Sequence, residues 1–171
     1  MDIPYKIFDN FLSDEDHKKV LQFCLESRYL YGESDGESEF IDYIPSGMTK
    51  DIIIFDPPYK ILSNKILQLC SEVKDLKLDR MYINCFAPNE NTYFHIDGTT
   101  YTFLYYPQHD WDISEGGETQ FYVNETIIGS PPKPNRMIMF SGETLVHRAM
   151  SFRNKYRFSI AIKYDSINSD A

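Results

Sequence analysis

The sequence predicts a mainly β fold with supporting α-helices, in which two N-terminal helices buttress a compact antiparallel sandwich or barrel. Aromatic residues make up 15% of the chain, with 13 tyrosines and 12 phenylalanines, and such residues favour strands. From residue 79 onward, short aromatic and β-branched runs alternate with turn signals, which predicts seven or eight strands in about 85 residues. Before residue 79, apolar residues recur at helical spacing instead.

Residues 1–78 are expected to contain one short strand and both helices. The segment "IPYKIFDNF" (3–11) is typical of a strand. Ser13 is a favourable N-cap, and the three acids after it suit the positive end of a helix dipole, which predicts a helix over about residues 14–29. The second helix follows Pro57-Pro58. Its buried stripe is expected to comprise Ile61, Leu62, Ile66, Leu69, Cys70 and Val73.

Between the two helices, residues 32–50 ("GESDGESEFIDYIPSGMTK") are polar, acidic and interrupted by glycine. This composition indicates a loop with room for one short strand. Such a loop is either a solvated connection or a lid over a site, because long loops in compact domains are often functional.

The strand-forming runs from residue 79 onward are separated by turn-rich segments such as "APNEN" and "SFRNK". They are "MYINCF" (81–86), "TYFHI" (92–96), "TTYTFLYY" (99–106), "ETQFYV" (118–123), "RMIMF" (136–140), "TLVHRAM" (144–150) and "YRFSIAIKY" (156–164).

The chain is expected to form a single domain over residues 1–171, with supporting elements in 1–78, the β core in 79–164 and a tail in 165–171. It carries 17 Lys and Arg against 26 Asp and Glu, and the resulting charge of −9 argues against a nucleic-acid partner. Three widely spaced cysteines without a CxxC pair indicate a reduced compartment. Without a signal-peptide pattern or a long apolar run, we expect a cytoplasmic protein with no membrane partner. The sequence leaves the oligomeric state open.

His95 and Asp97, in "TYFHIDG", are candidate metal ligands two positions apart. With four histidines and 26 acids in 171 residues, roughly 0.6 such pairs are expected by chance, so the pair alone decides little. On an extended segment, however, both side chains would point to the same face, and Gly98 would let the chain turn directly afterwards. Two of the other histidines, His17 and His109, are expected to be solvated rather than to bind a metal.

His147 supplies a third ligand, 52 residues after His95 on another short strand. Two imidazoles and one carboxylate on one face of an octahedral ion are the ligand set of non-haem Fe(II) oxygenases. Three coordination positions then remain open, of which a 2-oxo acid could fill two and dioxygen the third. The sequence therefore predicts a metal site at His95, Asp97 and His147.

Arg157, ten residues after His147, is expected to neutralise the remote carboxylate of such a cosubstrate, since its planar fork pairs with carboxylates. Strand alternation places Arg157, Ser159 and Ala161 on one face and Phe158, Ile160 and Ile162 on the other. An arginine flanked by small residues makes room for a ligand. The alternative, an arginine at the surface of an edge strand, would explain neither the small neighbours nor the spacing.

These motifs resemble the Fe(II)/2-oxoglutarate-dependent dioxygenases, and more narrowly their prolyl-4-hydroxylase-like branch. The resemblance covers about residues 79–164 and includes "FLYYPQHDW", "EGGETQFY" and "KPNRMIMFSGETLVHRAM"; residues 1–78 match only in kind. It implies a double-stranded β-helix of the jelly-roll or cupin-like kind. It also implies that His95, Asp97 and His147 are the catalytic iron ligands.

The resemblance also implies a cosubstrate pocket for 2-oxoglutarate. Arg157 would pair with the 2-oxoglutarate tail, and Tyr106 matches a position where the family often places a phenol hydrogen-bonded to the same carboxylate. Asn84, Tyr82 and Ser159 are further candidates for contact with the cosubstrate. Phe86 stands where prolyl hydroxylases commonly carry tyrosine, which removes one hydrogen bond.

The implied reaction is hydroxylation of a C–H bond coupled to decarboxylation of 2-oxoglutarate to succinate and CO₂, with Fe(II), O₂ and ascorbate as reductant. A prolyl residue of a protein or peptide is the substrate that the resemblance favours. Three alternatives stay open: an oxygenase acting on a free amino acid, another small molecule or a nucleobase; a non-catalytic metal-binding barrel that serves as a binding module; and a barrel for another divalent metal, such as a cupin-type isomerase.

Overall fold

The computed structural model describes residues 3–32 and 47–167. Most of the expected loop over 32–50, including its role as a lid, lies outside the described residues, as does the end of the expected tail. The last part of the segment 32–50 forms a short strand that begins at Met48. Within the described ranges, neither α-helix has the length and apolar character needed to cross a membrane.

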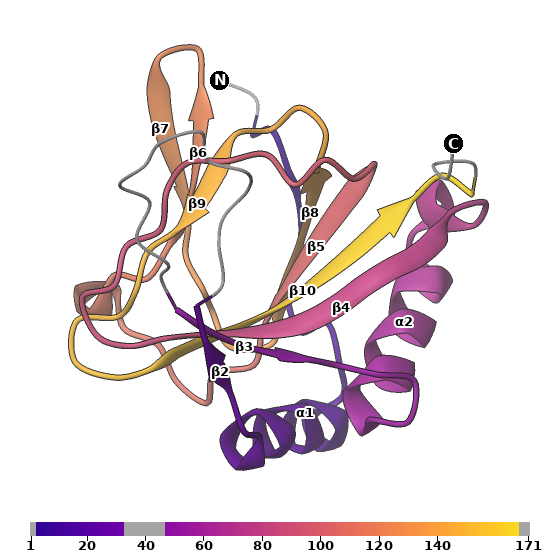
Figure 1. The fold of residues 1–171 in the computed structure, drawn as a ribbon, viewed down its shortest axis with the longest axis horizontal. Coiled ribbons are helices and arrows are strands. Elements are labelled where there is room, and N and C mark those ends of the chain that lie inside the picture. Colours follow the sequence, from indigo (N-terminus) through magenta and orange to yellow (C-terminus); the bar gives the residue numbers. More distant parts are fainter. Residues whose placement is uncertain (1–2, 33–46, 168–171) are drawn as a thin grey trace.

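The described residues form ten strands and two α-helices, with two short 3₁₀ turns (Figure 1). In chain order these are β1 (Lys6–Phe8), α1 (Asp14–Glu26), β2 (Leu30–Tyr31), β3 (Met48–Asp51), α2 (Pro57–Leu69), η1 (Ser71–Val73), β4 (Lys77–Phe86), β5 (Tyr101–Tyr106), η2 (Ile113–Glu115), β6 (Thr119–Val123), β7 (Thr126–Ser130), β8 (Arg136–Ser141), β9 (His147–Ala149) and β10 (Arg157–Asp165).

The strands form two antiparallel sheets. The large sheet has the order β1-β8-β5-β10-β4-β3-β2, and the small sheet has the order β7-β6-β9. Figure 1 shows both helices on one side of the large sheet and the small sheet on the other. The expected mainly β fold with two supporting helices is confirmed, and the seven strands from Lys77 onward agree with the expected seven or eight.

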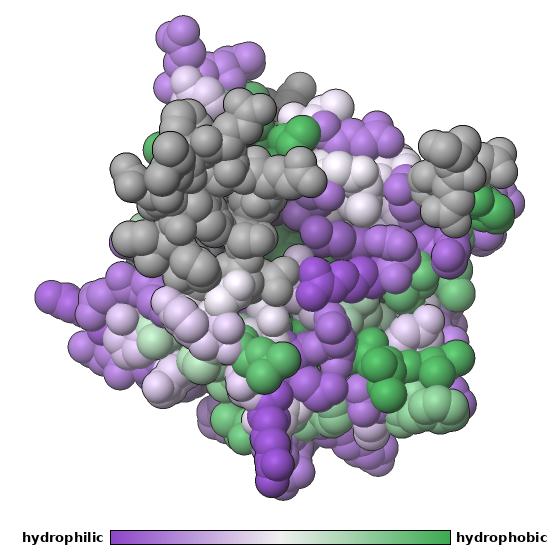
Figure 2. Space-filling view, in the orientation of Figure 1, coloured by the Kyte–Doolittle hydropathy of each residue, from purple (hydrophilic) through white to green (hydrophobic). Residues whose placement is uncertain are grey.

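The two faces of the large sheet bury different groups. The helix-covered face packs against α1 and α2 through apolar side chains such as Val20, Leu62, Ile66 and Ile160. The opposite face, toward the small sheet, carries a second apolar cluster around Phe121 and a polar cavity. Figure 2 shows that the exterior is mostly hydrophilic in the view of Figure 1, with hydrophobic residues in separate groups, one near the start of α2.

Both helices end earlier than the periodicity predicts. The first ends at Glu26, because Ser27 is extended and its hydroxyl donates to the carbonyl of Phe23. The second ends at Leu69, because Cys70 is extended and a 3₁₀ turn follows. Leu69 was expected in the buried stripe but is 47% exposed, since Cys70 and Val73 fill the buried positions after the chain leaves the helix.

The expected strand over 92–96 is not regular. Only two isolated bridges, Asn91 to Met150 and His95 to His147, join this segment to neighbouring chain. The segment connects β4 to β5 and touches β9 on the way, so point contacts replace a continuous ladder. These contacts position the candidate site.

Candidate metal centre and cosubstrate pocket

His95 and His147 face each other as a directly opposed antiparallel pair. The amide of each residue donates to the carbonyl of the other at 2.9 Å. Directly opposed residues place their side chains on the same face of the sheet. The two imidazole rings therefore lie side by side, with centroids 4.5 Å apart.

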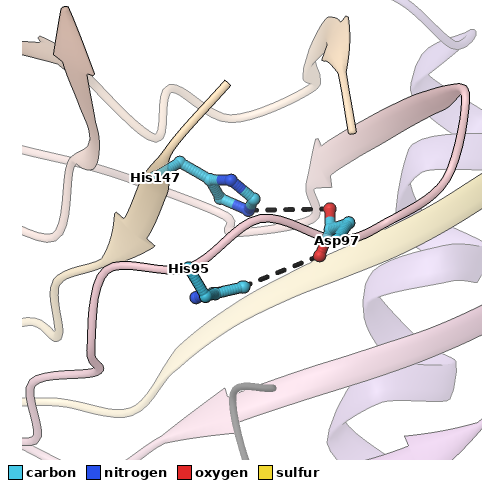
Figure 3. Close-up of side chains that lie close together, drawn as sticks. All are labelled: His95, Asp97 and His147. Carbon is cyan, nitrogen blue, oxygen red and sulfur yellow. Dashed lines mark ion pairs between the residues drawn. The ribbon is translucent and has the colours of Figure 1, made fainter. Parts of the chain in front are cut away.

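Asp97 reaches the same point because the chain is fixed directly after His95. The amides of Asp97 and Gly98 donate to the carbonyl of Gly142 at 2.9 and 3.0 Å. Gly98 has φ +72°, a conformation that side-chain-bearing residues rarely adopt, and it lets the chain turn into β5. Figure 3 shows His95 and His147 directed at Asp97 from two different segments.

The tautomers of the two histidines follow from their backbone contacts. Nδ1 of His95 lies 3.0 Å from the carbonyl of Tyr93, and Nδ1 of His147 lies 3.0 Å from the carbonyl of Leu145. A carbonyl oxygen only accepts, so each Nδ1 carries the proton. Each neutral ring then presents an unprotonated Nε2 toward Asp97, which is the form that binds a metal.

The three side chains have the geometry of a site that could hold a metal ion. Each Nε2 lies 3.6 Å from a different oxygen of Asp97, and all three ligand atoms lie within 4.8 Å of one another. Burial lowers the pKa of His147 to about 4, which keeps this ring neutral at pH 7. Burial alone would raise the pKa of Asp97, but neighbours that include Lys163 and the hydroxyl of Thr102 outweigh it and lower the pKa. A buried carboxylate flanked by two imidazole nitrogens fits a divalent ion.

Asp97 has two further partners that hold its carboxylate. Lys163 on β10 places Nζ 3.0 Å from Oδ1, and the hydroxyl of Thr102 on β5 donates to Oδ2. Burial lowers the pKa of Lys163, but Tyr82 and Asp97 together outweigh this and raise it, so the side chain is charged at pH 7. Each Asp97 oxygen is thus oriented before any ligand arrives.

Arg157 lines the same cavity and is fully buried. Its guanidinium donates to the carbonyl of Gly117 at 2.8 Å and to the hydroxyls of Ser159 and Thr119, each at 3.1 Å. None of these partners is an acid, and within the described residues no ion pair involves Arg157. A buried cation without a carboxylate partner is costly, which suits a site that receives an anion.

Tyr106 is also fully buried, next to this arginine. Its hydroxyl lies 2.7 Å from that of Thr119, which in turn accepts from Arg157. The guanidinium carbon of Arg157 lies 5.5 Å from the Tyr106 ring centroid and 5.7 Å from that of Phe86. Thr119 therefore links the phenol to the guanidinium.

The structure brings almost all the predicted site residues into one cavity. The cavity is lined by Tyr82, Asn84, Phe86, Thr92, His95, Asp97, Thr102, Leu104, Thr119, His147, Ala149, Arg157, Ser159 and Ala161. The predicted alternation of β10 is confirmed, since Ile160 and Ile162 belong to the helix-side core. Tyr106 is the predicted residue that does not line the cavity, and it reaches Arg157 through Thr119.

Sequence reasoning missed Lys163 and Thr119. Lys163 could have been found by extending the inward face of Arg157, Ser159 and Ala161 by two residues. Thr119 had no such signal, because its role depends on the register of β6 against the large sheet. Among the other histidines, His109 is exposed as expected, whereas His17 is not solvated: it is half-buried, and its Nδ1 lies 2.6 Å from the hydroxyl of Tyr105.

Comparisons with known proteins agree with this geometry. The sequence model of the 2OG-Fe(II) oxygenase superfamily matches residues 81–164, the segment that holds all the candidate ligands. A search of curated protein sequences found no significant match.

Solved structures with the same fold include three prolyl hydroxylases. A prolyl hydroxylase from Trichoplax adhaerens, in complex with a peptide fragment of the hypoxia inducible factor oxygen degradation domain, is 20% identical with a TM-score of 0.74, over 95% of this chain and 84% of that one. A prolyl-4-hydroxylase from Pseudomonas putida is 11% identical with a TM-score of 0.75, over 95% and 92%. The viral collagen prolyl hydroxylase of Paramecium bursaria Chlorella virus 1, in its 2OG complex, is 14% identical with a TM-score of 0.69, over 96% and 97%. The expected double-stranded β-helix is thereby confirmed.

Proposed function

Because this chain belongs to the 2OG-Fe(II) oxygenase superfamily, we propose that it hydroxylates a C–H bond with Fe(II), 2-oxoglutarate and O₂. In this proposal His95, Asp97 and His147 bind the iron. Arg157 binds the remote carboxylate of 2-oxoglutarate, and Tyr106, Asn84, Tyr82 and Ser159 shape the cosubstrate pocket.

The observation that carries the proposal is the convergence of three ligand atoms within 4.8 Å, in protonation states that suit a metal. The three side chains are nearly enclosed, with exposures of 18% for His95, 5% for Asp97 and 6% for His147. Two neutral nitrogens and one carboxylate on one side leave the opposite side for cosubstrate and dioxygen. Two histidines that served only to stabilise the fold would need neither a carboxylate shared by both rings nor a proton on both Nδ1 atoms.

Arg157 would bind and orient the cosubstrate. Its fork is already fixed by Gly117, Ser159 and Thr119, so little conformational freedom is lost when a carboxylate docks. Iron held by His95, Asp97 and His147 would supply activation of dioxygen, with two electrons provided by decarboxylation of 2-oxoglutarate to succinate. Leu104, Phe86 and Ala161 also line the cavity and give it apolar wall area.

A prolyl residue of a protein or peptide is the substrate that we propose first. Three proteins of the same fold are described as prolyl hydroxylases, and one of them was solved with a peptide. Identities of 20% or less carry the fold and leave the substrate as a proposal.

The test is cosubstrate turnover by the purified chain. The protein is loaded anaerobically with Fe(II), then given 2-oxoglutarate, ascorbate and O₂, and succinate is followed with and without proline-containing peptides. We expect succinate above the level of a His147→Ala control, stimulation by a peptide, and a 16-Da gain on its proline. Wild-type succinate no higher than that of the control, with iron and cosubstrate saturating, would contradict the oxygenase proposal; succinate without peptide hydroxylation would contradict the prolyl substrate.

A further inference from the structure

We propose that Lys163 binds a carboxylate of the substrate beside the metal centre, so that the substrate is a small acid or a C-terminal residue. This inference rests on the proposed function of the same site and narrows its substrate class. A neutral residue inside a peptide chain would not satisfy Lys163.

Lys163 lies on the cavity side of β10, at the opposite end from Arg157. It stands six residues after Arg157, on the same face, and pairs in register with Thr102 on one neighbouring strand and Arg80 on the other. Its side chain is only 15% exposed, and its Nζ contacts Oδ1 of Asp97. An ammonium group held this close to the candidate ligands is within reach of whatever binds there.

The charges of the site leave one cation unbalanced. Among the described side chains that line the cavity or contact its lining, one anion, Asp97, faces two cations, Arg157 and Lys163. Arg80 is paired with Asp51, and Glu118, whose charge acts on Arg157, is hydrogen-bonded to Gln120, so neither group changes the balance at Lys163. A divalent ion and doubly negative 2-oxoglutarate cancel each other. Among the described residues, the loaded site would therefore keep one positive charge at the Lys163 end, which one carboxylate would balance.

Asp97 alone cannot balance Lys163 once a metal is bound. A divalent ion takes up most of the charge of the Asp97 carboxylate, and two cations then share one anion. Lysine has a flexible four-carbon stem, so its ammonium can turn toward another acceptor in the cavity. In the proposed function Arg157 anchors the cosubstrate tail at the other end and the metal would take up the carboxylate beside the keto group. The substrate is then left as the source of that acceptor.

The surroundings of Lys163 indicate the size of the substrate. The Tyr82 ring lies close to both basic side chains, with its centroid 5.6 Å from Nζ of Lys163 and 4.1 Å from the guanidinium carbon of Arg80. Because Nζ is 3.0 Å from an oxygen of a candidate ligand, a carboxylate on Lys163 would lie only a few bonds from the reacting carbon. That arrangement suits an α-carboxylate next to a small ring or alkyl group packed on Tyr82.

The test compares acids with their neutral amides on the loaded protein. The full chain is saturated with Fe(II) and 2-oxoglutarate without oxygen, and binding is measured by calorimetry. One pair of probes is N-acetyl-L-proline and N-acetyl-L-prolinamide; the other is acetyl-Gly-Gly-Pro as acid and as amide. We expect at least about tenfold tighter binding of the acid in one pair, since truncating one partner of a buried charge pair costs at least this much. The pair with the larger ratio tells whether the source is a free acid or a peptide end.

Variants at Lys163 attribute the preference to its charge. Lys163→Met is expected to reduce the acid-to-amide ratio to about one, whereas Lys163→Arg and the exposed helix control Lys60→Met keep it. Loss of the ratio in Lys163→Met with 2-oxoglutarate affinity unchanged supports the proposal. Equal or absent binding of acid and amide by the wild type, or a preference that survives Lys163→Met, overturns it. Weakened 2-oxoglutarate binding with an intact preference also overturns it, because Lys163 would then serve the cosubstrate.

This result is separable from that of the proposed function. Acid binding is measured without turnover, so an acid preference without succinate formation would contradict the oxygenase proposal and leave the role of Lys163 standing. Succinate formation with equal binding of acid and amide would do the reverse.

Discussion

The two faces of β10 are built from alternate residues of one strand, and they differ in role: one packs against the helices and the other lines a polar cavity. Ile160 and Ile162 are fully buried against the two helices. Arg157 and Ser159 are equally buried, but they face a polar cavity on the other side. Burial alone therefore does not tell a stabilising position from a functional one.

The two faces differ in the surroundings that each buried side chain contacts. Apolar side chains on the helix side lose water and gain close packing, which stabilises the fold. The guanidinium on the cavity side finds three neutral acceptors and no acid, so its burial contributes little to stability and prepares a binding site. Substitutions on the two faces should accordingly separate stability from ligand binding.

The largest effect is expected at the metal centre. His147→Ala removes one of three ligands and should lower metal affinity by more than about 10²-fold, since even residues behind the ligands are worth that much. Calorimetry with Mn(II), together with the thermal shift caused by the metal, measures the loss. His109→Ala, in an exposed position, is the matched control and should bind as the wild type does. Undiminished Mn(II) binding by His147→Ala would place the metal elsewhere.

On the helix side, Ile160→Ala should reduce the free energy of unfolding by about 2–5 kcal/mol, because it leaves a cavity in the core. Urea denaturation measures this change, and Ile127→Ala, half exposed on β7, should change it by less than about 0.5 kcal/mol. At a temperature where the variant is folded, its affinity for 2-oxoglutarate should stay within about twofold of wild type. A large loss of affinity would show that the two faces are coupled.

Arg157→Met should have the opposite effect, with a large loss of 2-oxoglutarate affinity and a smaller loss of stability. Loss of the guanidinium should weaken 2-oxoglutarate binding to the metal-loaded protein by about 2–3 kcal/mol, or roughly 30–150-fold. Stability should fall less than in Ile160→Ala, because the buried cation has no acid partner to leave behind. Calorimetry and urea denaturation give the two values, with Arg148→Met on the small sheet as the control. Unchanged 2-oxoglutarate affinity would remove Arg157 from the cosubstrate site.

The strand parity that separates these faces could be predicted from the sequence. The period of two follows from local geometry alone, so the inward placement of Arg157 and Ser159 needed no knowledge of the neighbouring strands. The same holds for Tyr82 and Asn84, which both line the cavity.

Contacts that depend on register could not be predicted. The opposed pair of His95 and His147 requires an irregular segment to meet β9 at one residue, and the sequence instead suggested a regular strand. The link from Thr119 to Arg157 depends on how the two sheets stack. Leu69 likewise followed the helical period, but it is the last residue of α2 and is 47% exposed, and Cys70 and Val73 beyond the helix end take the buried positions.

Thr119→Val tests the link between Tyr106 and Arg157 without changing side-chain shape. Arg157 loses one acceptor, so 2-oxoglutarate affinity should fall about five- to tenfold, in line with about 1 kcal/mol per hydrogen bond. Thr126→Val, exposed on β7, is the matched control. Tyr106→Phe removes the phenol but leaves the Thr119 acceptor in place, so it should cost less affinity. An equal loss in both variants would indicate that the phenol itself contacts the cosubstrate.

The smallest effect is expected at His17, the histidine of the helix side. Burial lowers the pKa of His17 below its ordinary value of 6.5, so the folded state binds this proton less readily than the unfolded chain. Stability attributable to His17 is therefore lost as the pH falls through 6.5 toward the folded pKa. The melting temperature of wild type minus that of His17→Gln should decrease over this range by a few degrees at most. His147 titrates with the same sign, but it is present in both proteins and cancels in the difference. A difference that rises on acidification would mean that the folded state binds the His17 proton more tightly than the unfolded chain does.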